Sequence, residues 1–173
     1  MPLAGFLPGW ENWSATRRNH ALEHAAVTVL LERHGFGRSL AGRSNSRGFH
    51  IFGDVSTEEL KSAVDEALQR MQRGEGNLAV SPFCGTNIAV TGTLAALATL
   101  ALVGGGGVGK RVSRLPNLML GGIIATVAGQ PLGRLAQKYL TTSPDVARLR
   151  VKSVTRSGFG PFKGHWVETT QAA

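Results

Sequence analysis

The sequence predicts an α+β domain of two helices and three or four strands, interrupted by a two-helix transmembrane hairpin. Two runs without a charged residue, Asn77–Gly109 and Leu115–Gly133, predict the hairpin. Each run holds about the 20 apolar residues that a hydrocarbon core about 30 Å thick requires. The polar flanks carry both helical and period-two apolar patterns, which are typical of an α+β domain.

The two membrane spans are expected at Asn87–Val103 and Leu115–Leu132, with Pro131 bending or ending the second. The alternative is a hairpin buried in a soluble core, but the remaining chain has too few apolar residues to surround both helices. The chain is therefore divided into an N-terminal part of the α+β domain, the hairpin, and C-terminal strands that complete the domain: residues 1–86, 87–133 and 134–173.

The first helix is expected to begin at Ser14 or Thr16, either of which can cap it, and to end near Arg33 before Gly35. The stretch Gly37–Arg47 is rich in Gly, Ser, Arg and Asn and is interpreted as a loop.

The second helix is the clearest in the sequence. Ser56 and Glu59 have the spacing of a capping box, and apolar residues follow at helical intervals. Strands are expected at four places, each short and bounded by turn residues or alternating in polarity: Phe49–Phe52, Leu78–Phe83, the alternating stretch around Leu149 and Val151, and His165–Thr169.

One group of residues on the first helix has the spacing of a metal site. His20 and His24 lie one helical turn apart, so both imidazoles can reach one zinc ion. Glu23 lies close to both and could accept a proton from a metal-bound water. The alternative is that the histidines are buried polar residues satisfied by the backbone and that Glu23 pairs with a nearby arginine.

A catalytic zinc requires a third protein ligand and an open position. Cys84, at the mouth of the first span, is the first candidate, and His165 is the next. His50 and Glu168 follow. Each also has a simpler interpretation: Cys84 as a small buried hydrophobic residue, and the two histidines as surface residues of strands.

The order His20-x-x-Glu23-His24 resembles the inverzincins, the pitrilysin and insulinase class of zinc peptidases. In that class the two histidines bind zinc and the glutamate is the general base, so the resemblance implies these roles here. The third ligand of that class is a glutamate far downstream. The corresponding distance in this chain falls within the first span, which contains no acidic residue.

The chain as a whole resembles an uncharacterised family of small bacterial membrane proteins. Four short stretches carry the resemblance: N-H-A-L-E-H-A at Asn19–Ala25, L-A-G-R-S at Leu40–Ser44, C-G-T-N at Cys84–Asn87 and Q-P-L-G at Gln130–Gly133. This resemblance implies a membrane topology and no particular activity.

Composition indicates the partners. Lys and Arg number 19 against 11 Asp and Glu, which gives a net charge of +8. That balance suits an anionic lipid surface. It would also suit nucleic acid, but the interleaved basic and aromatic residues of nucleic-acid-binding proteins are missing, so we expect the bilayer and no nucleic acid. Small residues such as Gly129 and Gly133, at GxxxG spacing, could pair the hairpin with itself, with a second copy or with a membrane-complex partner.

We expect a multi-pass protein of the cell inner (cytoplasmic) membrane. Met1–Trp13 lacks the features of a signal peptide, and two spans place both flanks on one side, which we expect to be the cytoplasm. Lys110, Arg111 and Arg114 in the connecting loop favour the opposite orientation. The single cysteine, Cys84, excludes an internal disulfide and is compatible with a reducing compartment.

Two functions are therefore expected from the sequence. The first is a zinc-dependent, peptidase-like hydrolase site on the first helix, with Glu23 activating water to attack an amide. The second is a non-enzymatic accessory or scaffold protein of the membrane, in which the His/Glu cluster is structural. A converged third ligand beside an open cleft would favour the first.

Overall fold

The computed structural model describes residues 10–35, 39–103, 113–158 and 163–171. The chain forms two compact units: Met1–Ser81 together with Thr141–Ala173, and Pro82–Leu140. The expected loop residues Lys110 and Arg111 lie outside the described residues.

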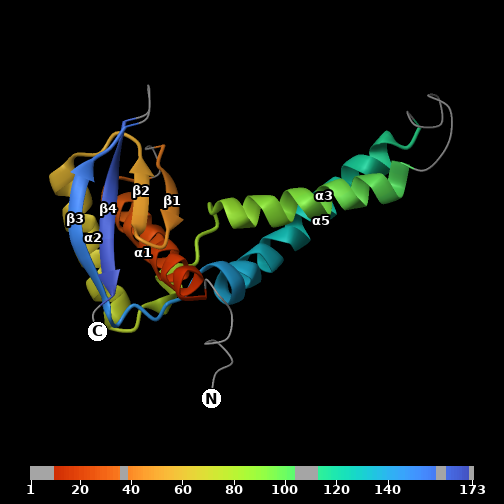
Figure 1. The fold of residues 1–173 in the computed structure, drawn as a ribbon. Helices are drawn as coiled ribbons and strands as arrows, with labels where there is room; N and C mark the ends of the chain where they lie inside the picture. The colour runs from red at the N-terminus through yellow and green to blue at the C-terminus, as the bar shows by residue number, and fades with distance from the viewer. Residues whose placement is uncertain (1–9, 36–38, 104–112, 159–162, 172–173) are drawn as a thin grey trace, which may run out of the picture. The chain divides into compact units, whose positions relative to one another are not determined.

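The first unit is an α+β fold with four antiparallel strands. Its elements are α1 (Trp10–His34), β1 (Ala41–Asn45), β2 (Gly48–Phe52), α2 (Thr57–Gln72), the 3-10 turn η2 (Gly76–Ala79), β3 (Leu149–Arg156) and β4 (Gly164–Gln171). The strand order is β1-β2-β4-β3, so the two hairpins of sequence-adjacent strands meet at the β2–β4 pair. Figure 1 shows α1 and α2 together on one face of this sheet.

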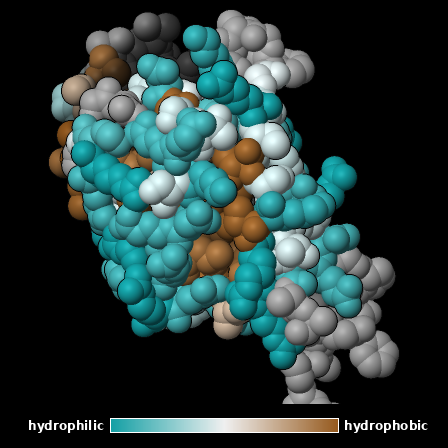
Figure 2. Space-filling model, turned by 90° about the vertical axis from the view of Figure 1, so that its left-hand side faces the viewer, coloured by the Kyte–Doolittle hydropathy of each residue, from teal (hydrophilic) through white to brown (hydrophobic). Residues whose placement is uncertain are grey.

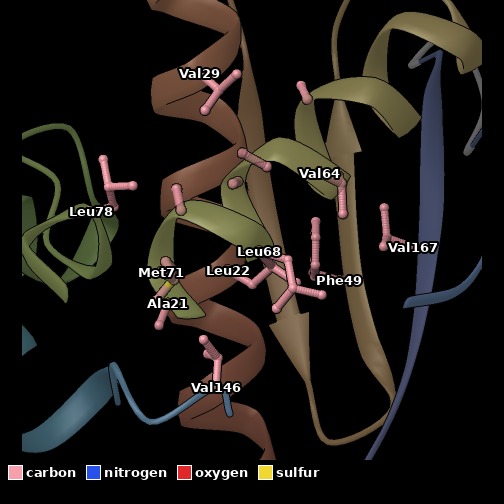
Figure 3. Close-up of a cluster of buried hydrophobic side chains, with 14 of the residues drawn as sticks. Ala21, Leu22, Val29, Phe49, Val64, Leu68, Met71, Leu78, Val146 and Val167 are labelled. Atoms are coloured by element: carbon pink, nitrogen blue, oxygen red, sulfur yellow. The ribbon is translucent and has the colours of Figure 1, made fainter. Parts of the chain in front are cut away.

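The core lies between the two helices and that face of the sheet (Figure 3). Leu22 and Val29 of α1, Val64 of α2, Phe49 of β2 and Val167 of β4 are all fully buried. Phe49 and Val167 are paired across the β2–β4 ladder, so their side chains lie next to each other on one face. The period-two and period-3.6 apolar patterns thus converge on one core.

The predicted capping box at α2 is confirmed, since the Ser56 side chain accepts from the Glu59 N–H and the Glu59 side chain accepts from the Ser56 N–H. Gly35 follows α1 with φ of +73°, the left-handed conformation that favours glycine after a helix. The predicted start of α1 at Ser14 or Thr16 is wrong, because the helix begins at Trp10. The Thr16 hydroxyl instead donates to the Asn12 carbonyl inside the helix.

Two strand predictions are also corrected. The stretch predicted as a loop contains the edge strand β1, which was missed because no apolar side chain alternates along Ala41–Asn45. The strand predicted at Leu78–Phe83 is absent. The chain there forms η2 instead. Leu78 and Ala79 are buried because they pack against the core, and none of the described strands pairs with this stretch.

The second unit is a helical hairpin of α3 (Gly85–Val103) and α5 (Leu115–Ala136), which lie side by side in Figure 1. A single π-helical turn, η3 (Gln137–Thr141), extends α5. Pro131 lies inside α5, so the prediction that it could end the helix is wrong. The two helices approach each other closely at two glycines of α5. A Cβ at Gly129 would lie 2.8 Å from Thr91 Cα, and one at Gly133 would lie 2.9 Å from Asn87 Cα. The GxxxG pair therefore packs within the hairpin.

The surfaces of the two units differ in polarity. Figure 2 shows a face of the molecule on which hydrophilic residues predominate, with a smaller hydrophobic area between them. The hairpin, in contrast, exposes large apolar side chains along its length, such as Leu100 at 71% and Val127 at 69%. Both of its helices are long and apolar enough to cross a membrane.

Candidate metal centre

His20 and His24 project from the same side of α1, as their spacing predicted. Their ring centroids lie 4.4 Å apart, with an interplanar angle of 62°. His24 is 5% exposed and His20 is partly buried. The structure therefore brings together the two imidazoles that the sequence analysis singled out.

Each ring is oriented by a backbone carbonyl. His20 Nδ1 lies 3.0 Å from the Thr141 carbonyl oxygen, and His24 Nδ1 lies 2.8 Å from the Ala79 carbonyl oxygen. A carbonyl oxygen can only accept, so both rings donate from Nδ1. In the neutral tautomer, the lone pair of each ring is then on Nε2.

The two carbonyls come from segments that are fixed to the first unit. Arg17 holds the chain next to Thr141, since its side chain donates to the Thr142 carbonyl at 2.7 Å from Nη2 and 3.1 Å from Nε. Ala79 is 2% exposed and belongs to the hydrophobic core. The positions of both acceptors are therefore set by packing and hydrogen bonds that do not involve the imidazoles.

Glu23 points from α1 to the edge strand β1. The Ser44 hydroxyl donates a hydrogen bond to Glu23 Oε2, and Glu23 is only 6% exposed. A Cβ at Gly42 would lie 2.0 Å from Glu23 Oε1 and 2.8 Å from Glu23 Cγ. The absence of a side chain at Gly42 thus makes room for the carboxylate, and Ser44 holds it there.

Asn19 fixes the same part of α1 to the sheet. Its Nδ2 donates to the Asn45 carbonyl at 2.8 Å, and its Oδ1 accepts from the Thr169 hydroxyl at 2.7 Å. Asn19 is fully buried. The stretch around His20 is therefore attached to both β1 and β4, which sequence reasoning did not foresee.

The remaining candidates in the first unit lie elsewhere. His165 Nε2 lies 3.0 Å from the Thr57 hydroxyl at the start of α2. Thr169, which bonds to Asn19 beside His20, is four residues further along β4, or about 13 Å at the rise of a strand. The structure thus does not bring His165 to the histidine pair.

His50 and Glu168 are also apart from the pair. His50 lies beside Trp166, with ring centroids 4.6 Å apart, and pairs with it across the β2–β4 ladder, on the sheet face opposite Phe49. Glu168 forms an ion pair with Lys152 at 2.8 Å, and the hydrogen bond from Lys152 lowers the pKa of the Glu168 carboxyl.

Cys84 belongs to the second unit and comes just before α3. Its Sγ accepts from the Thr86 N–H at 3.4 Å, and its carbonyl oxygen accepts from the Asn87 N–H at 2.9 Å. Cys84 thus forms the first turn that leads into the helix. Its part as a third ligand stays a prediction.

Comparison with known proteins shows that most of this chain matches one protein family. Residues 15–154 match the family described as Domain of unknown function (DUF6391). Over 150 residues the chain is 38% identical to an uncharacterised protein of Picosynechococcus sp. The aligned region covers 80% of this chain and 71% of that protein. Neither match is to a zinc peptidase. No solved structure shows a significant match.

Proposed function

The chain belongs to the DUF6391 family, and we propose that it is a small integral membrane protein in which His20 and His24 hold a metal ion. The observation that carries this proposal is the pair of hydrogen bonds from the two Nδ1 atoms to backbone carbonyls. Histidines that bind metals usually donate their other ring N–H to a carbonyl or carboxylate, which fixes the tautomer and the ring orientation. Both His20 and His24 have that arrangement, with Nδ1 bonded to a carbonyl and Nε2 left for a metal ion.

Cys84 is the third ligand in this proposal. Two imidazoles and a thiolate form a donor set that is compatible with metal binding and that suits zinc. Ala79, whose carbonyl orients His24, precedes Cys84 by five residues, and five residues span at most about 18 Å. The thiol is therefore connected by a short segment to the backbone that positions one of the histidines.

The exposed apolar surface of the hairpin supports insertion in the membrane. Leu100, Met119 and Val127 are each about two-thirds exposed, and burying such a side chain contributes about 1.5–3 kcal/mol. In a bilayer the lipid chains cover this surface, and the helices satisfy their own backbone hydrogen bonds. We place the protein in the cell inner (cytoplasmic) membrane as a two-span protein, with the α+β unit in the cytoplasm.

The activity that we assign to this centre is zinc-dependent hydrolysis of a peptide or another amide. A zinc ion bound there would supply Lewis acidity, which lowers the pKa of water toward about 7. The chain's own contribution is the Glu23 carboxylate, which follows His20 by three residues and precedes His24 by one. In this role Glu23 takes the proton of the attacking water, and the bond from Ser44 sets the direction of the carboxylate.

One observation favours the non-enzymatic alternative, an accessory or scaffold protein with a structural metal site. Glu23 is 6% exposed and already accepts a hydrogen bond from Ser44. In this alternative the carboxylate attaches α1 to β1 and contacts no substrate. The two functions therefore differ in what Glu23 does, while both use His20 and His24 as ligands.

Metal analysis of the purified full chain tests the proposal. The wild type should carry about one equivalent of zinc after dialysis, and His20→Ala, His24→Ala and Cys84→Ser should each lose most of it. His50→Ala is the matched control, since it removes a histidine of the same unit that lies on the other sheet face, and it should keep the metal. Equal zinc content in the wild type, His20→Ala and His24→Ala would refute the site.

Glu23→Gln distinguishes the two functions. In the hydrolase, the variant keeps zinc and the Ser44 contact but loses amide hydrolysis by several hundred-fold. In the accessory protein, wild type and variant both lack activity.

A further inference from the structure

The sheet has a second face, opposite α1 and α2. Figure 1 shows both helices on one side of the sheet, and no described helix of that unit lies on the other side. Phe49 and Val167 point into the core between the sheet and the helices. Neighbouring residues of a strand point to opposite faces, so His50 and Trp166 belong to the second face. We call it the open face of the sheet.

Three aromatic rings lie together on the open face. The His50 and Trp166 rings are 4.6 Å apart between centroids, and the Phe52 ring stacks on His50 at 5.6 Å with an interplanar angle of 13°. All three side chains are partly exposed. Tryptophan is enriched at membrane–water interfaces, because its ring is apolar on one side and its N–H can remain in water.

Arginine side chains border these rings. Arg43 is paired with His50 in the β1–β2 register, so it belongs to the same face. Arg47 lines a hollow of about 360 Å³ on this face together with His50 and Trp166. The hollow also contains Glu168, but its carboxylate is already held at 2.8 Å in an ion pair with a lysine of β3. The open face therefore combines partly exposed rings with an excess of positive charge.

Charge is divided between the two layers of this unit. The four strands carry four Lys and Arg residues against one Glu, whereas α2 carries four Asp and Glu residues against two cations. Of the four strand cations, only Arg156 turns to the helix side, where its Nε lies 3.4 Å from the Thr57 hydroxyl. Such a separation of charge orients a protein with its basic layer toward an anionic surface.

The chain also keeps this unit close to such a surface. The α+β unit continues directly into the hairpin at two places, from Ser81 to Pro82 and from Leu140 to Thr141. With the hairpin inserted in the bilayer, both connections hold the open face at a high effective concentration relative to the lipid headgroups. Anionic headgroups of the cytoplasmic leaflet attract clustered Lys and Arg residues. This step rests on the membrane insertion proposed above and is independent of the metal centre.

We propose that the open face of the sheet docks on the anionic surface of the membrane. Trp166 lies at the level of the headgroups, and Arg43 and Arg47 contact the lipid phosphates. The partner is an anionic lipid surface because the same face presents both the interfacial ring and the cations, and because the chain tethers that face to the bilayer.

Fluorescence quenching of Trp166 in vesicles tests this docking. The full chain carries Trp10→Phe and Trp13→Phe, which leaves Trp166 as the single tryptophan. The protein is reconstituted in phosphatidylcholine alone or with phosphatidylglycerol, and the lipids are brominated near the top of the acyl chains. We expect strong quenching only with phosphatidylglycerol, and its loss in about 1 M salt, where charges are screened beyond about 3 Å.

Two double variants with the same change in charge identify the surface. Arg43→Gln with Arg47→Gln should reduce the quenching to the level seen in phosphatidylcholine alone. Lys61→Gln with Arg73→Gln is the matched control, because it removes two cations from exposed positions of α2 and its C-terminus. This control should retain the full quenching. Both arginines of the test variant are exposed as well, so the fold should be retained.

Flotation of the vesicles after a carbonate wash shows whether the hairpin is inserted. If the protein floats and Trp166 is quenched equally with and without phosphatidylglycerol, or not at all, the docking is refuted while membrane insertion stands. An equal loss of quenching in the two double variants would also overturn the proposal. Bases stack on aromatic rings too, so a Trp166 signal that responds to an oligouridylate and not to phosphatidylglycerol would replace the lipid surface by single-stranded RNA.

Discussion

The Ser44 hydroxyl donates a hydrogen bond to the Glu23 carboxylate and so connects the edge strand β1 to the helix that carries the histidine pair. Gly42, two residues before Ser44, leaves the space in which this carboxylate lies. Two of the four stretches that suggested a membrane-protein family, Asn19–Ala25 and Leu40–Ser44, therefore meet at one side chain. The other two meet where Asn87 lies against Gly133.

Gly42→Ala should destabilise the α+β unit. The new Cβ would lie 2.0 Å from Glu23 Oε1, so the carboxylate must leave its position and lose the bond from Ser44. A buried hydrogen bond to a charged group contributes about 1.5–3 kcal/mol, and we expect a loss of that size. Urea unfolding of the full chain in detergent, followed by tryptophan fluorescence, measures it.

A double-mutant cycle checks this explanation. Glu23→Ala removes the side chain that the new methyl group would contact, so Gly42→Ala should cost much less in that background. The same cost in both backgrounds would show that the methyl group disturbs something other than Glu23.

His165 should make the fold less stable in acid. Burial lowers the pKa of His165, as does the nearby Arg156, against an opposing effect of Glu58. Below the unfolded pKa of about 6.5, the unfolded chain binds a proton that the folded chain does not, so stability falls as pH decreases from there toward the lower folded pKa. Unfolding midpoints at pH 7.5 and pH 5.5 test this window.

The variant His165→Phe should lose less stability than the wild type between these two pH values. His50 also has a lowered pKa, caused by burial and by Arg43, so part of the acid effect should persist until His50→Phe is added. An unchanged pH dependence in the double variant would contradict this account.

Gly133→Ala should weaken the hairpin. Its Cβ would lie 2.0 Å from Asn87 Oδ1 and 2.9 Å from Asn87 Cα, and an overpacked helix contact costs about 1–3 kcal/mol. Gly122→Ala on the same helix is the control, because a Cβ there has no neighbour within 4 Å. Unfolding by SDS in mixed micelles should separate the two variants, and equal stabilities would rule out the close packing at Gly133.

An arginine at Val127 should impair membrane insertion. Val127 lies near the middle of α5 and is 69% exposed, and an arginine at the centre of a span costs about 2.5–3.5 kcal/mol. Alkaline carbonate extraction of membranes should release Val127→Arg but retain the wild type. Ala147→Arg, at an exposed position of the other unit, should behave as the wild type does.

Local signals in the sequence were sufficient for most helices and strands. The capping box at Ser56, the left-handed Gly35 and the alternation at Leu149 and Val151 each concern neighbouring residues, and the structure has an element at each of these places. The strand β1 was missed because its inward positions, Gly42 and Ser44, face a carboxylate, and no apolar pattern results.

The candidate site was only partly predictable, because some of its contacts join residues that are far apart in the sequence. Helical spacing places His20 beside His24 without any knowledge of the fold. The carbonyls that orient them belong to Ala79 and Thr141, which are 55 and 121 residues away, and a backbone carbonyl has no signature in a sequence. His165 was considered as a ligand from its residue type alone, whereas the position of β4 takes it to the start of α2.

X-ray absorption at the zinc edge tests the central claim most directly, because it reports the donor atoms themselves. For the full chain loaded with one equivalent of zinc, we predict one sulfur at about 2.3 Å and imidazole nitrogens at about 2.0–2.1 Å. The imidazole signal should diminish in both His20→Ala and His24→Ala. A spectrum without sulfur or imidazole, or one that neither substitution changes, would contradict a metal centre on α1.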